Sequence, residues 1–219
     1  MTSLTESLTG TESMADRSYR ILRDRLIMLE IAPGEPINEG QLAVELDMGR
    51  TPIREALKRL EVDHLVVSYP RRGTFATNVD ITELAAISDM RTVLEPLAAR
   101  RAAEHRGGVD REELEQTISA VLSLDLSGNR RDLMAYDLEV HRQIYRAAQN
   151  EYLEETLVRL DNLATRIWCV VLDRLQDLHG HISEHATLLQ LILDGDADAA
   201  AQLAAEHVRG FERAVRAIL

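Results

Sequence analysis

Three segments in the second half of the chain place metal-binding residue types on the apolar stripes of predicted helices. A helix buries residues spaced three and four apart. The stripes run Met134, Asp137, His141, Ile144 and Ala148, then Ile182, His185, Leu189 and Ile192, then Leu203, His207, Phe211, Ala214 and Ile218. Each predicted helix therefore turns a carboxylate or an imidazole toward its core, where an unpaired polar group is costly.

A shared divalent cation would satisfy these buried groups together. Asp137 and His141 are four residues apart and so lie on one side of a helix. One carboxylate and three imidazoles suit zinc, and also nickel, manganese or iron. A single such histidine is usually a core residue bonded to a backbone carbonyl, but three on consecutive helices favour one metal ion per chain. Three other histidines lack the pattern and are expected to be solvated: His64, His105 and His179.

Composition narrows the class of protein. The 219 residues are 45% hydrophobic but only 4% aromatic, with 11 Gly and 5 Pro, which favours helices over a β-sandwich or barrel. The single cysteine allows neither an internal disulfide nor a cysteine-based zinc site. We find no signal peptide in residues 1–13 and no apolar run near the roughly 20 residues that span a bilayer. We therefore expect a soluble, cytoplasmic protein without membrane contact.

Charge is distributed unevenly along the chain. The net charge is -12, which argues against unspecific coating of nucleic acid. Residues 50–72 nevertheless carry six basic residues against three acidic ones, whereas residues 79–219 carry 15 basic and 25 acidic residues. The basic stretch therefore requires a specific explanation.

The order of predicted elements indicates two domains after a flexible tail of residues 1–13. In residues 14–79 we expect helices at 15–30, at 39–46 and from Thr51 onward, then β-prone runs at 65–69 and 74–77. Residues 80–219 read as six helices at 81–105, 110–126, 130–148, 151–177, 181–193 and 196–218. We expect a mainly α protein: a winged helix-turn-helix domain followed by an all-α bundle that binds a metal and an effector.

The basic stretch coincides with the parts of a winged helix-turn-helix that touch DNA. The second helix of the motif enters the major groove, and its N-terminal residues meet base edges. Thr51 is a plausible N-cap here, with Pro52 at the first helical position. The predicted DNA-binding residues are Arg50, Thr51, Arg54 and Lys58 on the helix, with Arg71, Arg72 and Gly73 on the wing. The alternative is a basic face that merely stays solvated.

The run from Gly49 to Leu60, GRTPIREALKRL, followed by PRRG at 70–73, resembles the DNA-binding module of the GntR family of bacterial transcription regulators. Residues 91–99, 137–150 and 183–185 resemble the FadR-type subgroup, whose all-helical effector domain is called FCD. The resemblance covers residues 15–218. It implies DNA reading by Arg50 and Arg54, and metal binding by Asp137, His141, His185 and His207. It also implies that Arg91 pairs with a small carboxylate effector, although an arginine there could instead form a surface ion pair with Glu95.

The chain departs from the family pattern at two places. Gly49 replaces the usual serine before Arg-Thr-Pro, which removes a hydroxyl that could bind phosphate. The pair Asp63-His64 stands where a Glu/Gly turn is common, so the start of the hairpin is expected to differ.

Three functions compete at this point. The first is a homodimeric repressor that binds double-stranded operator DNA and responds to a small organic acid near the metal. The second is a zinc metallohydrolase that uses His181, Glu184 and His185 as an H-x-x-E-H motif. The third is a DNA-binding regulator in which the metal is purely structural. The hydrolase leaves the whole N-terminal module unexplained.

Overall fold

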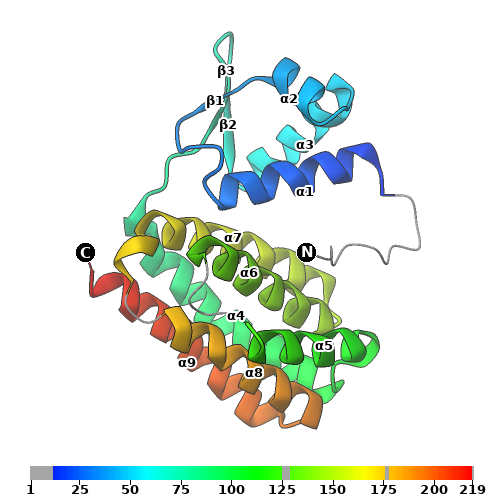
Figure 1. The fold of residues 1–219 in the computed structure, drawn as a ribbon, viewed down its shortest axis with the longest axis vertical. Helices are drawn as coiled ribbons and strands as arrows, with labels where there is room; N and C mark the ends of the chain where they lie inside the picture. Colours follow the sequence, from blue (N-terminus) through cyan, green and yellow to red (C-terminus); the bar gives the residue numbers. More distant parts are fainter. Residues whose placement is uncertain (1–11, 125–128, 176–177, 219) are drawn as a thin grey trace. The chain divides into compact units, whose positions relative to one another are not determined.

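The computed structural model of the chain describes residues 12–124, 129–175 and 178–218. The chain divides into two compact units, and the first ends at Asn78. The second begins at Val79, one residue before the predicted start of the helical domain at 80. The fold is mainly helical, as predicted (Figure 1). Residues 1–11 of the expected tail lie outside the described residues.

The N-terminal unit is a winged helix-turn-helix. Its elements are α1 (Met14–Ile27), β1 (Pro36–Ile37), α2 (Glu39–Glu45), α3 (Arg50–Val62), β2 (Val66–Tyr69) and β3 (Gly73–Ala76). The helices pack through buried aliphatic residues, among them Leu22, Leu26, Ile53 and Leu60. The first helix is shorter than predicted because the chain turns after Met28 and Leu29 adopts a left-handed φ of 57°.

Short polar side chains set where the helices of this unit begin. Ser13 Oγ accepts a hydrogen bond from Asp16 N, and Asn38 Oδ1 accepts from Gly40 N and Gln41 N. The prediction for α3 was wrong by two residues: this helix begins at Arg50 after Gly49, which supplies no side-chain cap. Thr51 is therefore inside the first turn, where Pro52 is still tolerated.

The three strands form one antiparallel sheet in the order β1-β3-β2. Val66 pairs with Ala76 and Tyr69 with Gly73, while Pro36 on the outer strand pairs with Phe75. The sequence did not predict β1, which has only two residues and follows a turn that looks like a simple break. At the wing tip, Arg71 and Gly73 have φ values of 62° and 95°, and glycine adopts this conformation without strain.

The second unit is a bundle of six helices in the described residues. They are α4 (Leu84–Glu104), α5 (Arg111–Leu122), α6 (Arg130–Ala147), α7 (Glu151–Val171), α8 (Leu178–Asp194) and α9 (Ala197–Arg216). Three short 3-10 turns accompany them, at Ile81–Glu83, Gly108–Asp110 and Leu172–Arg174. The fourth predicted helix was too long, since α7 ends at Val171. The expected helical residues 125–126 and 176–177 lie outside the described part of the chain.

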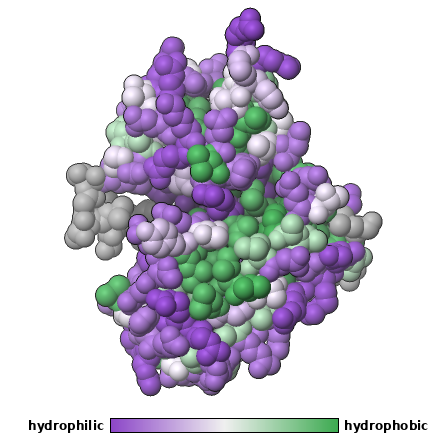
Figure 2. All heavy atoms as spheres, turned by 180° about the vertical axis from the view of Figure 1, so that it is seen from behind, coloured by the Kyte–Doolittle hydropathy of each residue, from purple (hydrophilic) through white to green (hydrophobic). Residues whose placement is uncertain are grey.

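Helix α4 lies at the centre of this bundle and packs against α6, α7, α8 and α9. Its small residues Ala98, Ala99, Ala102 and Ala103 are buried and belong to the same core cluster as Tyr145. Hydrophobic residues also reach the surface of this unit, where they gather on the face seen in Figure 2. Within the described residues, every helix is too short or too polar to cross a lipid bilayer.

Candidate functional site

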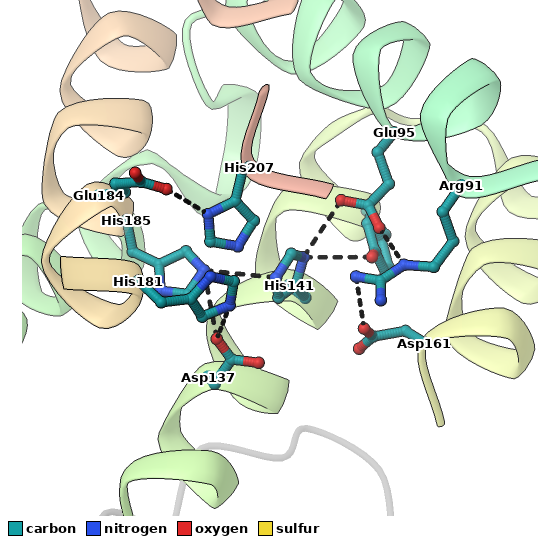
Figure 3. A network of polar contacts seen from close by, with 10 residues as sticks. Arg91, Glu95, Asp137, His141, Asp161, His181, Glu184, His185 and His207 are labelled. Carbon is teal, nitrogen blue, oxygen red and sulfur yellow. Dashed lines mark hydrogen bonds and ion pairs between the residues drawn. The ribbon is translucent and has the colours of Figure 1, made fainter. Parts of the chain in front are cut away.

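The four predicted metal ligands come together inside the helical unit. Asp137 and His141 lie on α6, His185 on α8 and His207 on α9 (Figure 3). None is more than 4% exposed, and one ligand atom from each lies within 4.8 Å of those of the others. We call these four residues the metal-ligand cluster.

Distances inside the metal-ligand cluster match the spacing of ligands around one ion. His185 Nε2 lies 3.3 Å from His141 Nε2 and 3.5 Å from Asp137 Oδ1. Ligands 2.0–2.1 Å from a tetrahedral zinc are about 3.3 Å from each other. Asp137 Oδ1 and His207 Nε2 are buried without a hydrogen-bond partner, which is costly unless a cation satisfies them. The residues present therefore fit a divalent metal ion.

Neighbouring groups hold two of the imidazoles by their Nδ1 atoms. Glu184 Oε2 lies 2.9 Å from His207 Nδ1, and the Tyr145 hydroxyl lies 3.2 Å from His141 Nδ1. Contacts of this kind fix the ring orientation and the tautomer of a metal-binding histidine. In both residues Nε2 is thus the atom available to the metal-ligand cluster.

The protonation states of the buried groups also suit metal binding. Burial lowers the pKa of His207 to about 4 and that of His185 well below its usual value, so both rings are neutral at pH 7. Burial alone would raise the pKa of Asp137, but the neighbouring His181, His185 and His141 outweigh it and hold this pKa well below the usual range. Neutral imidazoles and an ionised carboxylate are the forms that bind a metal ion.

A buried ion network adjoins the cluster on the side of α4. Arg91 Nε lies 2.5 Å from Glu95 Oε1, and Arg91 Nη2 lies 3.0 Å from Asp161 Oδ1 on α7. Glu95 Oε2 in turn lies 3.5 Å from His141 Nδ1 (Figure 3). We call Arg91, Glu95 and Asp161 the Arg91 network. The Arg91–Glu95 pair considered from the sequence is therefore present, but it is buried instead of lying on the surface.

Burial and charge oppose each other in the Arg91 network. Burial alone would lower the pKa of Arg91 and raise that of Glu95, but their attraction outweighs burial and keeps both ionised. For Asp161 burial wins, and its pKa is raised despite the nearby guanidinium. Two carboxylates thus share one internal cation, and Asp161 Oδ2 has no hydrogen-bond partner.

Sequence reasoning did not single out Glu95 and Asp161 as site residues, although a usable signal was present. Both lie on buried rows of their helices: Ser88, Arg91, Glu95, Ala98 and Ala102 on α4, and Leu153, Leu157, Asp161, Ala164 and Trp168 on α7. The test that found the metal ligands, a polar residue on an apolar stripe, finds these carboxylates as well.

His181 was predicted to begin the helix at 181–193, but the structure starts this helix three residues earlier. α8 begins at Leu178 and carries His181 one turn before His185. The His181 ring stacks on His207 with centroids 3.9 Å apart, and its Nε2 lies 3.3 Å from Asp137 Oδ1. The Glu184 carboxylate contacts His207 Nδ1 at 2.9 Å. The H-x-x-E-H motif therefore does not present Glu184 as a free general base. Of the histidines expected to be solvated, His64 and His105 are exposed, and the side chain of His179 lies outside the described part.

In the N-terminal unit, all the predicted DNA-binding residues are solvent-exposed. They are Arg50, Thr51, Arg54 and Lys58 on α3, and Arg71, Arg72 and Gly73 at the wing tip. Arg54 Nε forms an ion pair with Glu39 Oε2 of α2 at 2.6 Å. The sequence did not identify this pairing, because it depends on how α2 meets α3.

The Asp63-His64 departure is accommodated without loss of the hairpin. His64 adopts a left-handed φ of 61°, and the backbone N–H of Leu65 donates to the carbonyl of Leu60. Asp63 accepts a hydrogen bond from the Tyr19 hydroxyl at 2.6 Å. The turn that glycine usually provides is thus formed by histidine, and Asp63 ties the end of α3 to α1.

Comparison with known proteins identifies both units. Residues 14–76 match the model of bacterial regulatory proteins of the gntR family, and residues 86–210 match the FCD domain. The chain belongs to the GntR family of regulators. GntR regulators bind DNA to control transcription, so membership of this family leaves the hydrolase alternative without support.

Similar proteins agree with this membership over almost the whole chain. The HTH-type transcriptional repressor RspR of Escherichia coli is 24% identical over 96% of this chain and 92% of its own length. The galactonate operon transcriptional repressor of the same species is 23% identical over 95% of this chain and 99% of its own. The solved structure of E. coli McbR/YncC has a TM-score of 0.81 at 21% identity, covering 94% of this chain and 99% of that one, and shares the fold.

Proposed function

We propose that this GntR regulator is a homodimeric repressor whose affinity for operator DNA is controlled by a small organic acid, bound beside a divalent metal in the helical unit. The metal-ligand cluster carries the proposal. Asp137, His141, His185 and His207 would hold the ion, with zinc as the first choice and nickel, manganese or iron as alternatives. The ion would supply a positive charge that attracts an effector carboxylate.

The Arg91 network would form the other wall of the effector site. Arg91 would turn from one of its internal carboxylates toward the acid group of the effector, and Asp161 Oδ2 is free to accept a hydrogen bond from an effector hydroxyl. A hydroxylated acid suits both groups. Galactonate, named for one relative, is an acid of this chemistry.

DNA recognition is assigned to the exposed basic residues of α3 and the wing. Arg54 and Arg50 would read base edges and phosphates, supported by Thr51 and Lys58, and Arg71, Arg72 and Gly73 would approach the backbone or the minor groove. A pseudo-palindromic operator requires two such units.

A second copy of the chain is proposed to cover an apolar face of α4. Met90, Val93 and Leu97 are 50%, 69% and 44% exposed, and their spacing places them on one side of the helix. Exposed apolar side chains that share a face are typical of interaction surfaces. Mass measurement in solution tests this part of the proposal, and a monomer would contradict it.

The decisive experiment titrates the zinc-loaded protein into fluorescent DNA from upstream of its own gene. Arg54→Ala is expected to weaken binding about 5- to 100-fold, the usual loss for a base-reading arginine. Arg174→Ala, at an exposed arginine of the helical unit, is the matched control and is expected to bind normally. Unchanged affinity of Arg54→Ala would contradict the DNA-reading assignment.

Effector control is tested separately by adding sugar acids and hydroxy acids to the preformed complex. At least one is expected to release the DNA from the metal-loaded protein and not from protein treated with a chelator. If the chelator lowers the melting temperature but no acid affects DNA binding, the metal is structural and the sensing role is wrong.

A further inference from the structure

We propose that Glu55 selects cytosine in the operator, by accepting a hydrogen bond from the N4 amino group of this base in the major groove. The inference rests on the proposed DNA-reading role of α3 and adds a specificity-determining residue to it. Glu55 is solvent-exposed on α3 and directly follows Arg54. It is an acidic residue among side chains that are otherwise neutral or basic.

Glu55 lies on the exposed side of α3. Thr51 is four residues before it and Lys58 three residues after it, and residues at these spacings are neighbours on one helix face. All three side chains are exposed. The opposite side of the helix is formed by the buried residues Ile53, Ala56, Leu57 and Leu60. A surface that brings Thr51 and Lys58 to DNA therefore brings the Glu55 carboxylate there as well.

Glu55 differs from neighbouring acidic residues because its carboxylate has no partner. Glu39 forms an ion pair with Arg54. Glu61 Oε1 accepts a hydrogen bond from the backbone N–H of Ser68 at 2.8 Å. Within the part of the chain that the structure describes, the Glu55 carboxylate forms neither a hydrogen bond nor an ion pair. Both of its oxygens are thus available to a donor on the DNA.

A carboxylate on a DNA-binding surface requires a donor when the complex forms. The phosphates repel it, and a buried carboxylate without a partner is costly. In the major groove, the donors are the amino groups of cytosine and adenine. Adenine presents the N7 acceptor beside its amino group, which repels a carboxylate, whereas cytosine presents only the N4 donor. Cytosine is therefore the base that fits Glu55.

The test compares the sequence preferences of the zinc-loaded, full-length wild type and its variants by selection from a library of random DNA duplexes. At one position of each half-site, the wild type should prefer cytosine by about 5- to 100-fold, the usual cost of a mismatched base. Glu55→Gln should shift this preference toward adenine, because glutamine pairs with adenine N6 and N7. Glu55→Ala should lose the preference. Glu61→Gln keeps an acceptor for Ser68 and is the matched control, expected to select the wild-type sequence.

A second measurement needs only the wild type and decides the proposal even if the variants fail to fold. Each cytosine of the selected half-site is replaced in turn by N4-methylcytosine. This base still pairs with guanine but carries a methyl group in place of the amino hydrogen that faces the major groove. At the position read by Glu55, the Kd measured by fluorescence anisotropy should rise about 5- to 100-fold.

Three results would overturn the proposal. An unchanged base preference of Glu55→Gln, or a Kd that no N4-methylcytosine affects, would do so and leave the assignment of Arg54 intact. Equally tighter binding of Glu55→Gln to all sequences would show that the carboxylate only repels the phosphates. A wild type that selects no sequence at all would refute both this proposal and the DNA-reading role of α3.

Discussion

Glu184 holds the His207 ring by its Nδ1 atom, 2.9 Å from the carboxylate, and so leaves the buried Nε2 atom to the metal-ligand cluster. The contact joins α8 to α9, two helices that each supply a ligand. The His207 contact also lowers the pKa of Glu184, which keeps the carboxylate ionised. Glu184 is therefore a positioning residue for the proposed metal.

Replacing Glu184 by glutamine tests this role. The amide cannot hold the N–H form of the ring as firmly, so Zn²⁺ affinity should fall about 10- to 100-fold. Calorimetric titration measures the loss. Glu206→Gln is the matched control, because this exposed carboxylate on α9 contacts Gln202. Equal affinities for both variants would show that Glu184 does not position His207.

Arg91 is expected to stabilise the helical unit as well as to bind the proposed effector. Arg91→Ala leaves Glu95 and Asp161 buried without their cation, which should cost about 3–5 kcal/mol of unfolding free energy. Urea denaturation measures this difference. Arg100→Ala breaks only the exposed pair with Asp198 and should cost at most about 1 kcal/mol. A similar small loss for both variants would mean that the buried network does not stabilise the bundle.

Glu39 is expected to restrain DNA binding. Its carboxylate pairs with Arg54 at 2.6 Å on an exposed surface, and this pair must open when the guanidinium meets DNA. Glu39→Gln should therefore strengthen binding about 2- to 5-fold, the equivalent of an exposed ion pair, as read by fluorescence anisotropy. Glu45→Gln on the same helix is the control, because Glu45 pairs with Arg25 instead. Weaker DNA binding by Glu39→Gln would contradict this prediction. It would mean that Glu39 orients the Arg54 side chain toward the DNA base that it contacts.

The Tyr19–Asp63 hydrogen bond predicts a loss of stability at high pH. Burial, followed by the contact with Asp63, raises the pKa of Tyr19 to about 12. Because the folded state favours the neutral phenol, this stabilisation is complete below the unfolded pKa near 10 and is lost as pH rises through 12. Tyr19→Phe should lose about 1 kcal/mol at pH 8, and its deficit should shrink toward pH 12 in urea denaturation. A pH-independent difference would contradict this account.

Periodicity alone was enough to predict the metal-ligand cluster. Asp137, His141, His185 and His207 each lie on an apolar stripe, and a stripe fixes which side of a helix faces the core. The winged helix-turn-helix was predictable from the same periodicity together with Pro and Gly at its turns. The basic residues indicated which parts of it meet DNA. Glu95 and Asp161 obey the same rule, so they were within reach of the sequence.

Other features depend on the meeting of distant segments and could not be predicted. The Arg54–Glu39 pair and the Tyr19–Asp63 hydrogen bond each join different helices. The position of the His181 ring could not be predicted either, because it depends on packing against Trp168 of α7 and His207 of α9. Strand β1 is two residues long and carries no periodic signal.

The order of the ligands along the chain has a consequence for biosynthesis. The DNA-reading unit is contained in residues up to Asn78, whereas the metal-ligand cluster is complete only with His207 on α9. A nascent polypeptide on the ribosome therefore acquires its DNA-reading surface long before it can capture a cation, since domains generally fold in order of synthesis. If the proposed metal is bound, operator recognition would mature first, and metal loading would follow as a late step after translation has passed His207.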